Sequence, residues 1–200
     1  MKRVHLALFA LMLAASALLA KTDVAVAAVA TSIDVCCPWN AKLADGDLTY
    51  KISGASGATL TAMLDAVENW ETETGITLTP ATGRTKPDIA LKFKTGGGSV
   101  QGQALRKFDS NGFVTSVNIN VSGMAFGIDV GAVHQITMHE MGHALGAGHA
   151  NGDGVLMSPT INGGVDGITS CDRAAVLAAQ NWYFEDPSSP TQPSVTSVSC

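Results

Sequence analysis

The stretch that decides the fold of this chain runs from His139 to His149 and reads HEMGHALGAGH. Its first two histidines, His139 and His143, are four residues apart, so a helix would place both on one face, about one turn apart. Two imidazole nitrogens in that arrangement can bind one metal ion at roughly 2.0–2.1 Å. Glu140 is offset from this face by about 100° around the helix. Its carboxylate therefore stays free to act on a water molecule at the metal.

A third histidine reaches the same metal ion only if the helix ends and the chain turns back. Gly146 can adopt a positive φ and end the helix sharply, which brings His149 into position. Three nitrogen ligands with a fourth position open are typical of a catalytic zinc site. We therefore predict that His139, His143 and His149 bind Zn²⁺ and that Glu140 is the general base. The alternative is a helix whose histidines are merely exposed or capped.

A methionine follows in the segment Val155–Pro159, which reads VLMSP, and Met157 is eight residues beyond His149. Zinc motifs of this extended form are followed by such a turn in one group of metalloproteases. The chain here resembles the metzincins and, within them, the matrixins, the catalytic domains of the matrix metalloproteinases. The likeness extends over residues 39–184. It implies a zinc endopeptidase in which Met157 lies beneath the metal.

The residue patterns and this likeness together predict a zincin-like α+β fold. Short apolar or alternating segments favour strands over residues 48–52, 76–79, 88–93, 101–108 and 113–121. Helical spacing or capping predicts helices over residues 58–70 and 131–145, and a last helix capped by Thr169 and Asp172. We expect a twisted mixed sheet with two helices above the cleft. A small, loop-rich lower subdomain with a C-terminal helix follows Gly146.

The N-terminus has the pattern of a secretory signal. Lys2 and Arg3 precede an apolar stretch from Val4 to Ala20, and cleavage sequences of small residues follow between Ala17 and Ala30. We predict a signal peptide over residues 1–30 and a secreted protein with no stable membrane insertion after its removal. The alternative is an uncleaved membrane anchor, although the stretch is shorter than the ~20 residues that span a bilayer.

The rest of the chain has the composition of one globular domain. Hydrophobic residues make up 46% and charged residues 14% of the 200 residues. A net charge of −5 without a basic stripe excludes a nucleic-acid partner. We predict a monomeric catalytic domain over residues 31–186, irregular over residues 31–47. The Pro-, Ser- and Thr-rich tail over residues 187–200 is expected to be disordered or a linker.

The four cysteines, an even number in a secreted chain, predict two disulfides. Neighbouring cysteines rarely bond each other, because the geometry is strained. We therefore expect Cys36 and Cys37 to pair with Cys171 and Cys200, in one of two ways. Latent matrixins block their zinc with a propeptide cysteine, but the segment 34–39 lacks the propeptide motif of that family.

The number of histidines limits the zinc sites that the chain can form. Matrixins carry a second, structural zinc with further histidine ligands, whereas this chain has five histidines in all. His5 lies in the signal, and only His134 is left over, so a single zinc is expected and His134 is a surface or boundary residue. Calcium is a second candidate cofactor at residues 109–112 and 151–154, although both are ordinary turn sequences.

The expected substrate is a protein or peptide bound extended along the edge strand near Gln101–Leu105 by backbone hydrogen bonds. The matrixin likeness implies that Pro159–Asn162 form one wall of the specificity pocket. Two other functions stay open: a non-catalytic secreted binding or adhesion module that retains the fold, and a zinc hydrolase of non-protein (cell-wall) substrates. The intact Glu140 argues against the binding module, because binding needs no general base.

Overall fold

The computed structural model describes residues 31–45, 47–96, 101–123, 129–160 and 165–200, so the predicted signal peptide lies outside the described residues. The strands are β1 (Ser32–Val35), β2 (Asp47–Ser53), β3 (Thr77–Pro80), β4 (Ile89–Thr95), β5 (Gly102–Phe108), β6 (Val114–Gly123), β7 (Ala147–Ala150) and β8 (Ser197–Ser199). The helices are η1 (Leu43–Asp45), α1 (Gly57–Thr74), α2 (Val130–Ala144), α3 (Ser170–Ala179) and α4 (Asn181–Glu185). Within the described residues, no helix combines the length and apolar character needed to cross a membrane.

The larger sheet of the molecule is a five-stranded mixed sheet in the order β3-β2-β4-β6-β5. The strands β3, β2, β4 and β6 are parallel, whereas β5 is antiparallel to β6 and lies at the edge. The two strands predicted over residues 101–108 and 113–121 are therefore confirmed, and they form an antiparallel pair. From Val117 to Gly123 in β6, buried residues alternate with partly or fully exposed ones, which matches a strand with one face against the core.

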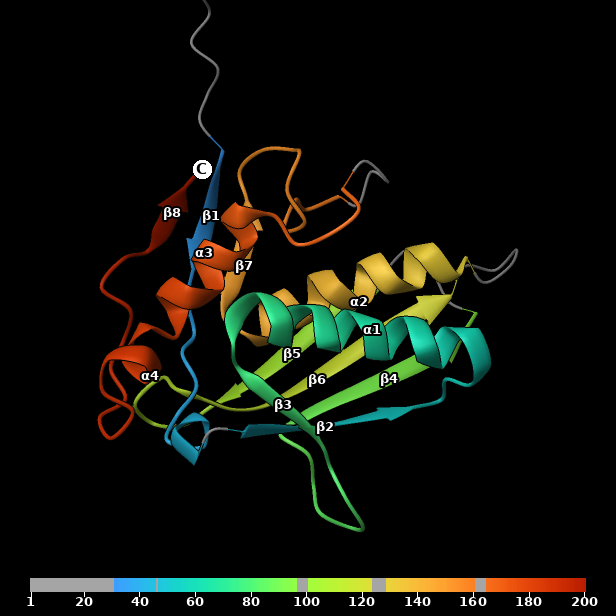
Figure 1. The fold of residues 1–200 in the computed structure, drawn as a ribbon, viewed down its shortest axis with the longest axis horizontal. Coiled ribbons are helices and arrows are strands. Elements are labelled where there is room, and N and C mark those ends of the chain that lie inside the picture. The colour runs from blue at the N-terminus through green and yellow to red at the C-terminus, as the bar shows by residue number, and fades with distance from the viewer. Residues whose placement is uncertain (1–30, 46, 97–100, 124–128, 161–164) are drawn as a thin grey trace, which may run out of the picture.

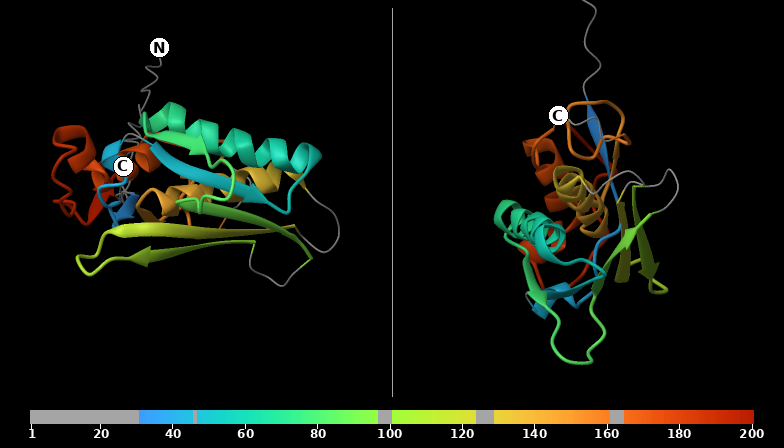
Figure 2. Two further views of the ribbon diagram at one scale, coloured as in Figure 1. Left: turned by 90° about the horizontal axis from the view of Figure 1, so that it is seen from below. Right: turned by 90° about the vertical axis from the view of Figure 1, so that its right-hand side faces the viewer.

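Helices α1 and α2 lie side by side on one face of this sheet (Figures 1 and 2). Trp70 of α1 is fully buried, and its indole Nε1 donates to the carbonyl of Met138 in α2 at 2.8 Å. Trp70 thus fills the space between α1 and α2, and its buried N–H group has a hydrogen-bond partner. The expected α+β architecture with two helices against a mixed sheet is confirmed.

The C-terminal end of α2 is held by residues far away in the sequence. The indole Nε1 of Trp39 donates to the carbonyl of Ala144 at 2.9 Å, and the amide Nε2 of Gln180 donates to the carbonyl of Leu145 at 2.9 Å. Both side chains are completely buried. Helix ends leave carbonyls without partners inside the helix, and these two side chains supply the partners at the point where the chain turns toward β7.

The two ends of the described chain contain more regular structure than the sequence predicted. Residues 31–47 were expected to be irregular and residues 187–200 disordered or a linker, but β1 and β8 pair in a three-stranded sheet of order β7-β1-β8. Each strand has only three or four residues, too few to show a sequence period. Their pairing is long-range, which is why local composition did not reveal it.

The predicted disulfide pairing is wrong. Cys36 is bonded to its neighbour Cys37, and Cys171 is bonded to Cys200. The pairing of β8 with β1 brings the C-terminus beside the first turn of α3, where the Cα atoms of Cys171 and Cys200 are 5.4 Å apart. Cys37 adopts a φ of +61°, a conformation that no other described residue except glycine shares.

Asp88, which is partly buried just before β4, links three segments of the chain. Its carboxylate accepts hydrogen bonds from Lys42 Nζ at 2.6 Å and from the backbone N–H and hydroxyl of Thr49 at 3.0 and 2.6 Å. Burial alone would raise the pKa of Asp88, but these hydrogen bonds and the charge of Lys42 outweigh it and hold the pKa below its usual value. A lowered folded-state pKa means that this stabilisation is complete above the unfolded pKa of about 3.9 and is lost as the pH falls through the folded value.

We expect Asp88→Asn to lower the free energy of unfolding by about 1–3 kcal/mol at pH 7, because hydrogen bonds to a charged acceptor are lost. The difference from the wild type should shrink below about pH 4, where the wild-type carboxylate also becomes protonated. Urea unfolding at several pH values measures both effects. Asp65→Asn, an exposed site on α1 with the same charge change, is the control. Equal losses for the two variants would contradict the role of Asp88.

Candidate metal centre and catalytic cleft

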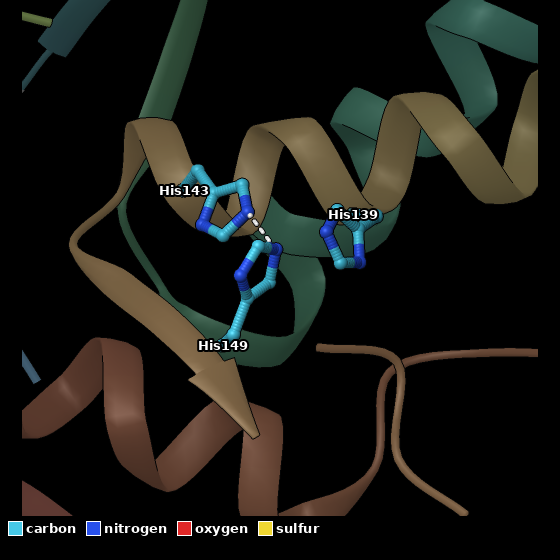
Figure 3. A group of neighbouring side chains, drawn as sticks. All are labelled: His139, His143 and His149. Atoms are coloured by element: carbon cyan, nitrogen blue, oxygen red, sulfur yellow. Dashed lines mark hydrogen bonds between the residues drawn. The ribbon is translucent and has the colours of Figure 1, made fainter. Parts of the chain in front are cut away.

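Three histidines converge at the end of α2, as predicted (Figure 3). His139 and His143 project from α2, and His149 comes from β7. One ring nitrogen of each lies within 4.8 Å of the others, and the Nε2 atoms of His143 and His149 are 3.1 Å apart. Two nitrogen ligands of a tetrahedral zinc ion, each at about 2.0–2.1 Å, lie about 3.3 Å from each other.

The tautomers of the two helical histidines are fixed by backbone carbonyls. Nδ1 of His139 lies 2.7 Å from the carbonyl oxygen of Leu156, and Nδ1 of His143 lies 2.9 Å from that of Ala147. A carbonyl only accepts, so each Nδ1 carries the proton and each Nε2 presents a lone pair. Such partners are typical of metal-binding histidines.

Burial keeps these imidazoles neutral. It lowers the pKa of His143 to about 3, against the hydrogen bond to Ala147, and lowers the pKa of His139 as well. Neutral imidazole is the form that binds a metal ion. The Nε2 atoms of His143 and His149 are 3.1 Å apart, a separation close to that of two nitrogen ligands on one tetrahedral metal ion. The donor set therefore fits one zinc ion with an open fourth position.

Glu140 lies beside this cluster without joining it. It is 6% exposed, and its Oε2 atom is buried with no hydrogen-bond partner among the described residues. Burial raises the pKa of Glu140 to about 7, while the charge of Arg106 and a hydrogen bond from the backbone N–H of Ala104 lower it. A carboxylate with a pKa near neutrality can both take up and release a proton at physiological pH.

The turn that delivers His149 requires Gly146. Its φ is +106°, in the region that favours glycine. A Cβ atom at this position would lie 2.6 Å from Cβ of Ala179 and 2.7 Å from the carbonyl oxygen of Cys36. Backbone conformation and space therefore both demand glycine here, and the predicted helix-ending role of Gly146 is confirmed.

Met157 lies against α2, where Gly142 makes room for it. Met157 is fully buried, and a Cβ atom on Gly142 would lie 2.5 Å from its Sδ atom and 3.0 Å from Cζ2 of Trp70. The segment after His149 thus packs directly against the helix that carries His139 and His143. A larger residue than glycine at position 142 would collide with Met157 and Trp70.

We expect Gly142→Ala to lower the free energy of unfolding by about 1–3 kcal/mol, because the added methyl group overpacks the core between Met157 and Trp70. Gly167→Ala is the matched control, since a Cβ atom there meets nothing within 4 Å. Thermal unfolding of both variants measures the difference. A Gly142→Ala protein as stable as the control would contradict this packing.

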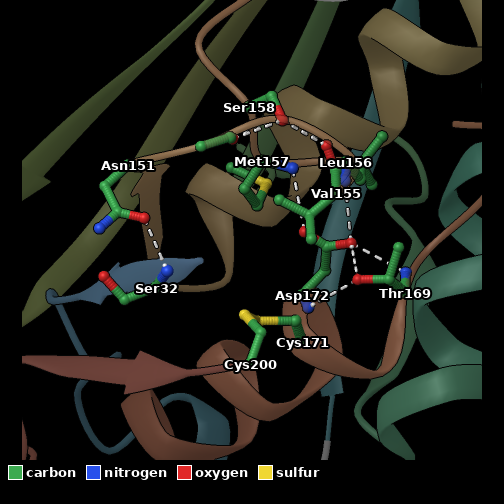
Figure 4. Close-up of a disulfide and its surroundings, with 11 residues drawn as sticks. Ser32, Asn151, Val155, Leu156, Met157, Ser158, Thr169, Cys171, Asp172 and Cys200 are labelled. Atoms are coloured by element: carbon green, nitrogen blue, oxygen red, sulfur yellow. Dashed lines mark hydrogen bonds between the residues drawn. A yellow bond between two sulfur atoms is a disulfide. The ribbon is translucent and has the colours of Figure 1, made fainter. Parts of the chain in front are cut away.

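Asp172 has a role that the sequence did not reveal (Figure 4). It completes the predicted capping box with Thr169, accepting from its N–H at 2.8 Å and its hydroxyl at 2.6 Å. The same carboxylate, completely buried, also accepts the N–H groups of Leu156 at 3.0 Å and Met157 at 2.9 Å. Because the carbonyl of Leu156 accepts from His139, Asp172 supports a residue of the histidine cluster through Leu156.

A cleft lies between β5 and two of the three histidines, His143 and His149. It has a volume of about 360 Å³ and is lined by Gly102, Gln103, Ala104, Arg106, Glu140, His143, Gly148 and His149. A second cavity of about 400 Å³ lies along α2 and includes Gln101, Gln135, Met138 and Val165. The predicted substrate strand near Gln101–Leu105 thus borders both cavities. The predicted wall at Pro159–Asn162 lies partly outside the described residues.

The remaining predicted residues lie away from the metal cluster. Nε2 of His134 is 3.2 Å from Nδ2 of Asn69 in α1, and its side chain is partly buried, as a boundary position requires. In the two turns proposed for calcium, Asp109 Oδ1 accepts the N–H groups of Asn111 and Phe113, and Asn151 Oδ1 accepts that of Ser32. Calcium binding stays a prediction.

The family relationship follows from comparison with known proteins. No curated protein sequence matches the chain. The model of the family described as matrixin matches residues 38–183. This range includes the sheet with its two helices, the three histidines, Met157 and Asp172. Because the match covers more than half of the chain, the chain belongs to the matrixin family.

Proposed function

We propose that this matrixin is a secreted, monomeric zinc endopeptidase, with His139, His143 and His149 as the zinc ligands and Glu140 as the general base. The observation that carries the proposal is the arrangement of two fixed neutral imidazoles, a third histidine and a buried carboxylate without a full set of partners in one cleft. A module that only binds its target has no use for such a carboxylate, which costs stability when buried.

The metal ion, Glu140 and strand β5 have separate roles in this mechanism. A zinc ion, when bound, supplies Lewis acidity that polarises the scissile carbonyl and makes water a better nucleophile. Glu140 takes a proton from the attacking water and passes it to the leaving amine. The N–H of Ala104 orients the carboxylate of Glu140. The open edge of β5 holds the substrate extended by backbone hydrogen bonds, next to the histidines.

Secretion is supported by two features of the chain. The N-terminal 30 residues have the signal-peptide pattern. The described part of the chain forms two disulfides and has no free cysteine, as expected of a protein that matures in an oxidising compartment. The domain over residues 31–186, together with the β8 segment that pairs with β1, carries the proposed activity.

The proposal predicts a metal-dependent peptidase. The purified mature chain should cleave casein or a mixed peptide library, lose the activity to background with 1,10-phenanthroline, and recover it when zinc is added back, because the metal supplies much of the chemistry. Cleavage that persists after complete removal of metal would contradict the mechanism. Zinc binding without cleavage of any peptide would favour the binding module, and hydrolysis of cell-wall peptides alone would favour the other alternative.

A further inference from the structure

The side chain of Arg106 brings a positive charge into the catalytic cleft. Residues alternate along β5, so Gly102, Ala104 and Arg106 face inward, whereas Gln103 and Lys107 are exposed. Arg106 lines the same cleft as Glu140 and His149. A guanidinium keeps its charge under all ordinary conditions, so the cleft carries a fixed positive charge beside the histidines.

The surroundings of Arg106 leave this charge largely uncompensated. Its Nη1 atom lies against the sulfur atoms of Cys36 and Cys37, and sulfur is a weak hydrogen-bond acceptor. Among the described residues, the ion pair between Lys42 and Asp88 is the only one. The charge of Glu140 acts on Arg106 from a longer distance. Arg106 is also partly withdrawn from water, and a cation in that position gains from an added carboxylate partner.

The strand geometry shows where a substrate group would meet this charge. The carbonyl of Gln101 accepts the N–H of Ser122 in β6, and backbone groups alternate in direction along a strand. The N–H of Ala104 therefore points to the open edge of β5, where it bonds to Glu140. Residues two apart direct their backbone groups to the same side, and the N–H of Arg106 points to that edge as well. Directly opposite residues of paired strands project on the same face, with Cβ atoms about 4.5–5.5 Å apart. The substrate residue opposite Arg106 therefore projects toward the guanidinium.

Resting on the proposed function, we infer that Arg106 is a specificity-determining residue that selects an Asp or Glu side chain two residues from the scissile bond. The carboxylate of Glu140 lies beside Gly102 and Ala104, because a Cβ atom on Gly102 would meet its Oε1 atom and the N–H of Ala104 bonds to it. Arg106 follows two residues after Ala104, about 7 Å along the strand. That distance corresponds to two residues of an extended substrate. The guanidinium can receive a carboxylate there with two parallel hydrogen bonds.

The disulfide holds the guanidinium in place for this role. Cys36 follows β1, and its N–H donates to the carbonyl of Gly146 at 3.0 Å. The sulfur atoms that touch Arg106 are thus attached to the same turn that delivers His149. A guanidinium held against a fixed surface loses less conformational freedom when a substrate carboxylate binds.

The test compares matched peptides that differ at one residue. Peptides blocked at both ends carry Glu or Gln at each position two residues from the cut, and kcat/KM is measured for the wild type, Arg106→Gln and Lys107→Gln. Lys107 is the control because it is the next residue, faces away from the cleft and undergoes the same charge change. We expect the wild type and Lys107→Gln to prefer Glu over Gln at one of these positions by at least tenfold. In Arg106→Gln that ratio should fall to about one, and in Arg106→Glu a Lys peptide should be preferred.

Two further measurements keep this inference separate from the proposed function. Fluorescence polarisation gives the Kd of the Glu and Gln peptides for zinc-loaded Glu140→Ala protein, with and without Arg106→Gln, so the preference can be measured without turnover. Peptides with a free C-terminus and Gln at the test positions show whether a terminal carboxylate replaces the side chain. Cleavage or binding without an acidic preference, a preference kept in Arg106→Gln, or a preference that needs the free terminus would each overturn the inference. Absence of any cleavage, with the acidic preference intact in binding, would contradict only the peptidase.

Discussion

Glu140→Ala is expected to lower kcat/KM for a peptide substrate by about 10²–10⁴-fold, the range for loss of a general base. Zinc should remain bound at one ion per chain, because Glu140 lies beside the three histidines and is not part of the metal cluster. Steady-state kinetics with a fluorogenic peptide, together with metal analysis of the same sample, measures both quantities. Loss of zinc together with activity would show that Glu140 is needed for the metal and would contradict its assigned role.

Two controls sharpen this result. Glu68→Ala removes an exposed carboxylate from α1 and should leave kcat/KM unchanged. Glu140→Gln keeps the shape of the side chain but cannot accept the proton, so its activity should be as low as that of Glu140→Ala. A Glu140→Gln enzyme with near wild-type turnover would show that the carboxylate only fills space.

The pH profile follows from the state of the same carboxylate. Burial raises the pKa of Glu140 to about 7 in the metal-free chain, and the positive charge of a bound zinc ion lowers it. Below this pKa the protonated side chain cannot accept a proton from water. The acid limb of kcat/KM should therefore fall below pH 7 and be absent from the residual activity of Glu140→Ala.

Asp172→Ala has the second large expected effect, a loss of about 3–5 kcal/mol in the free energy of unfolding. The carboxylate is completely buried and accepts four hydrogen bonds, from Leu156, Met157 and Thr169. Its removal leaves several buried donors without a partner, each at a cost of about 1–3 kcal/mol. Urea unfolding measures the loss, and zinc titration should show weaker binding, because the Leu156 carbonyl that orients His139 is no longer held.

Thr169→Ala separates the two roles of Asp172. It removes the side-chain cap and the hydroxyl hydrogen bond to Asp172 but keeps the hydrogen bonds from Leu156 and Met157, so it should cost about 1 kcal/mol, with zinc affinity unchanged. Glu185→Ala, an exposed acid near the C-terminus, controls for the change of charge. If Asp172→Ala were no more destabilising than Thr169→Ala, the hydrogen bonds to Leu156 and Met157 would contribute nothing and this part of the account would be wrong.

The parts of the structure that the sequence predicted are those governed by local patterns. The spacing of His139 and His143, the glycine at 146 and the alternation in β6 each follow from the geometry of a single helix, turn or strand. The metal cluster could be predicted because its three ligands lie within eleven residues. The capping box of Thr169 was equally local.

The parts that were missed depend on contacts between distant segments. The rule that neighbouring cysteines rarely bond failed at Cys36 and Cys37, because the β8 strand takes Cys200 to Cys171 and leaves the pair together. Asp172 reaches Leu156 across sixteen residues. Arg106 could have been noticed as a charged residue on the inward face of a predicted strand, a placement that is unusual without a partner, but only the fold shows which cleft it faces.

Metal analysis of the dialysed mature protein tests whether the three histidines form a zinc site. We expect one zinc ion per chain in the wild type, loss of most of this zinc in His149→Ala, and full retention in His134→Ala, since His134 contacts Asn69 and lies outside the cluster. A wild-type chain that binds no zinc, or a His149→Ala chain that binds it as tightly as the wild type, would contradict the assignment of these three histidines as the catalytic metal site.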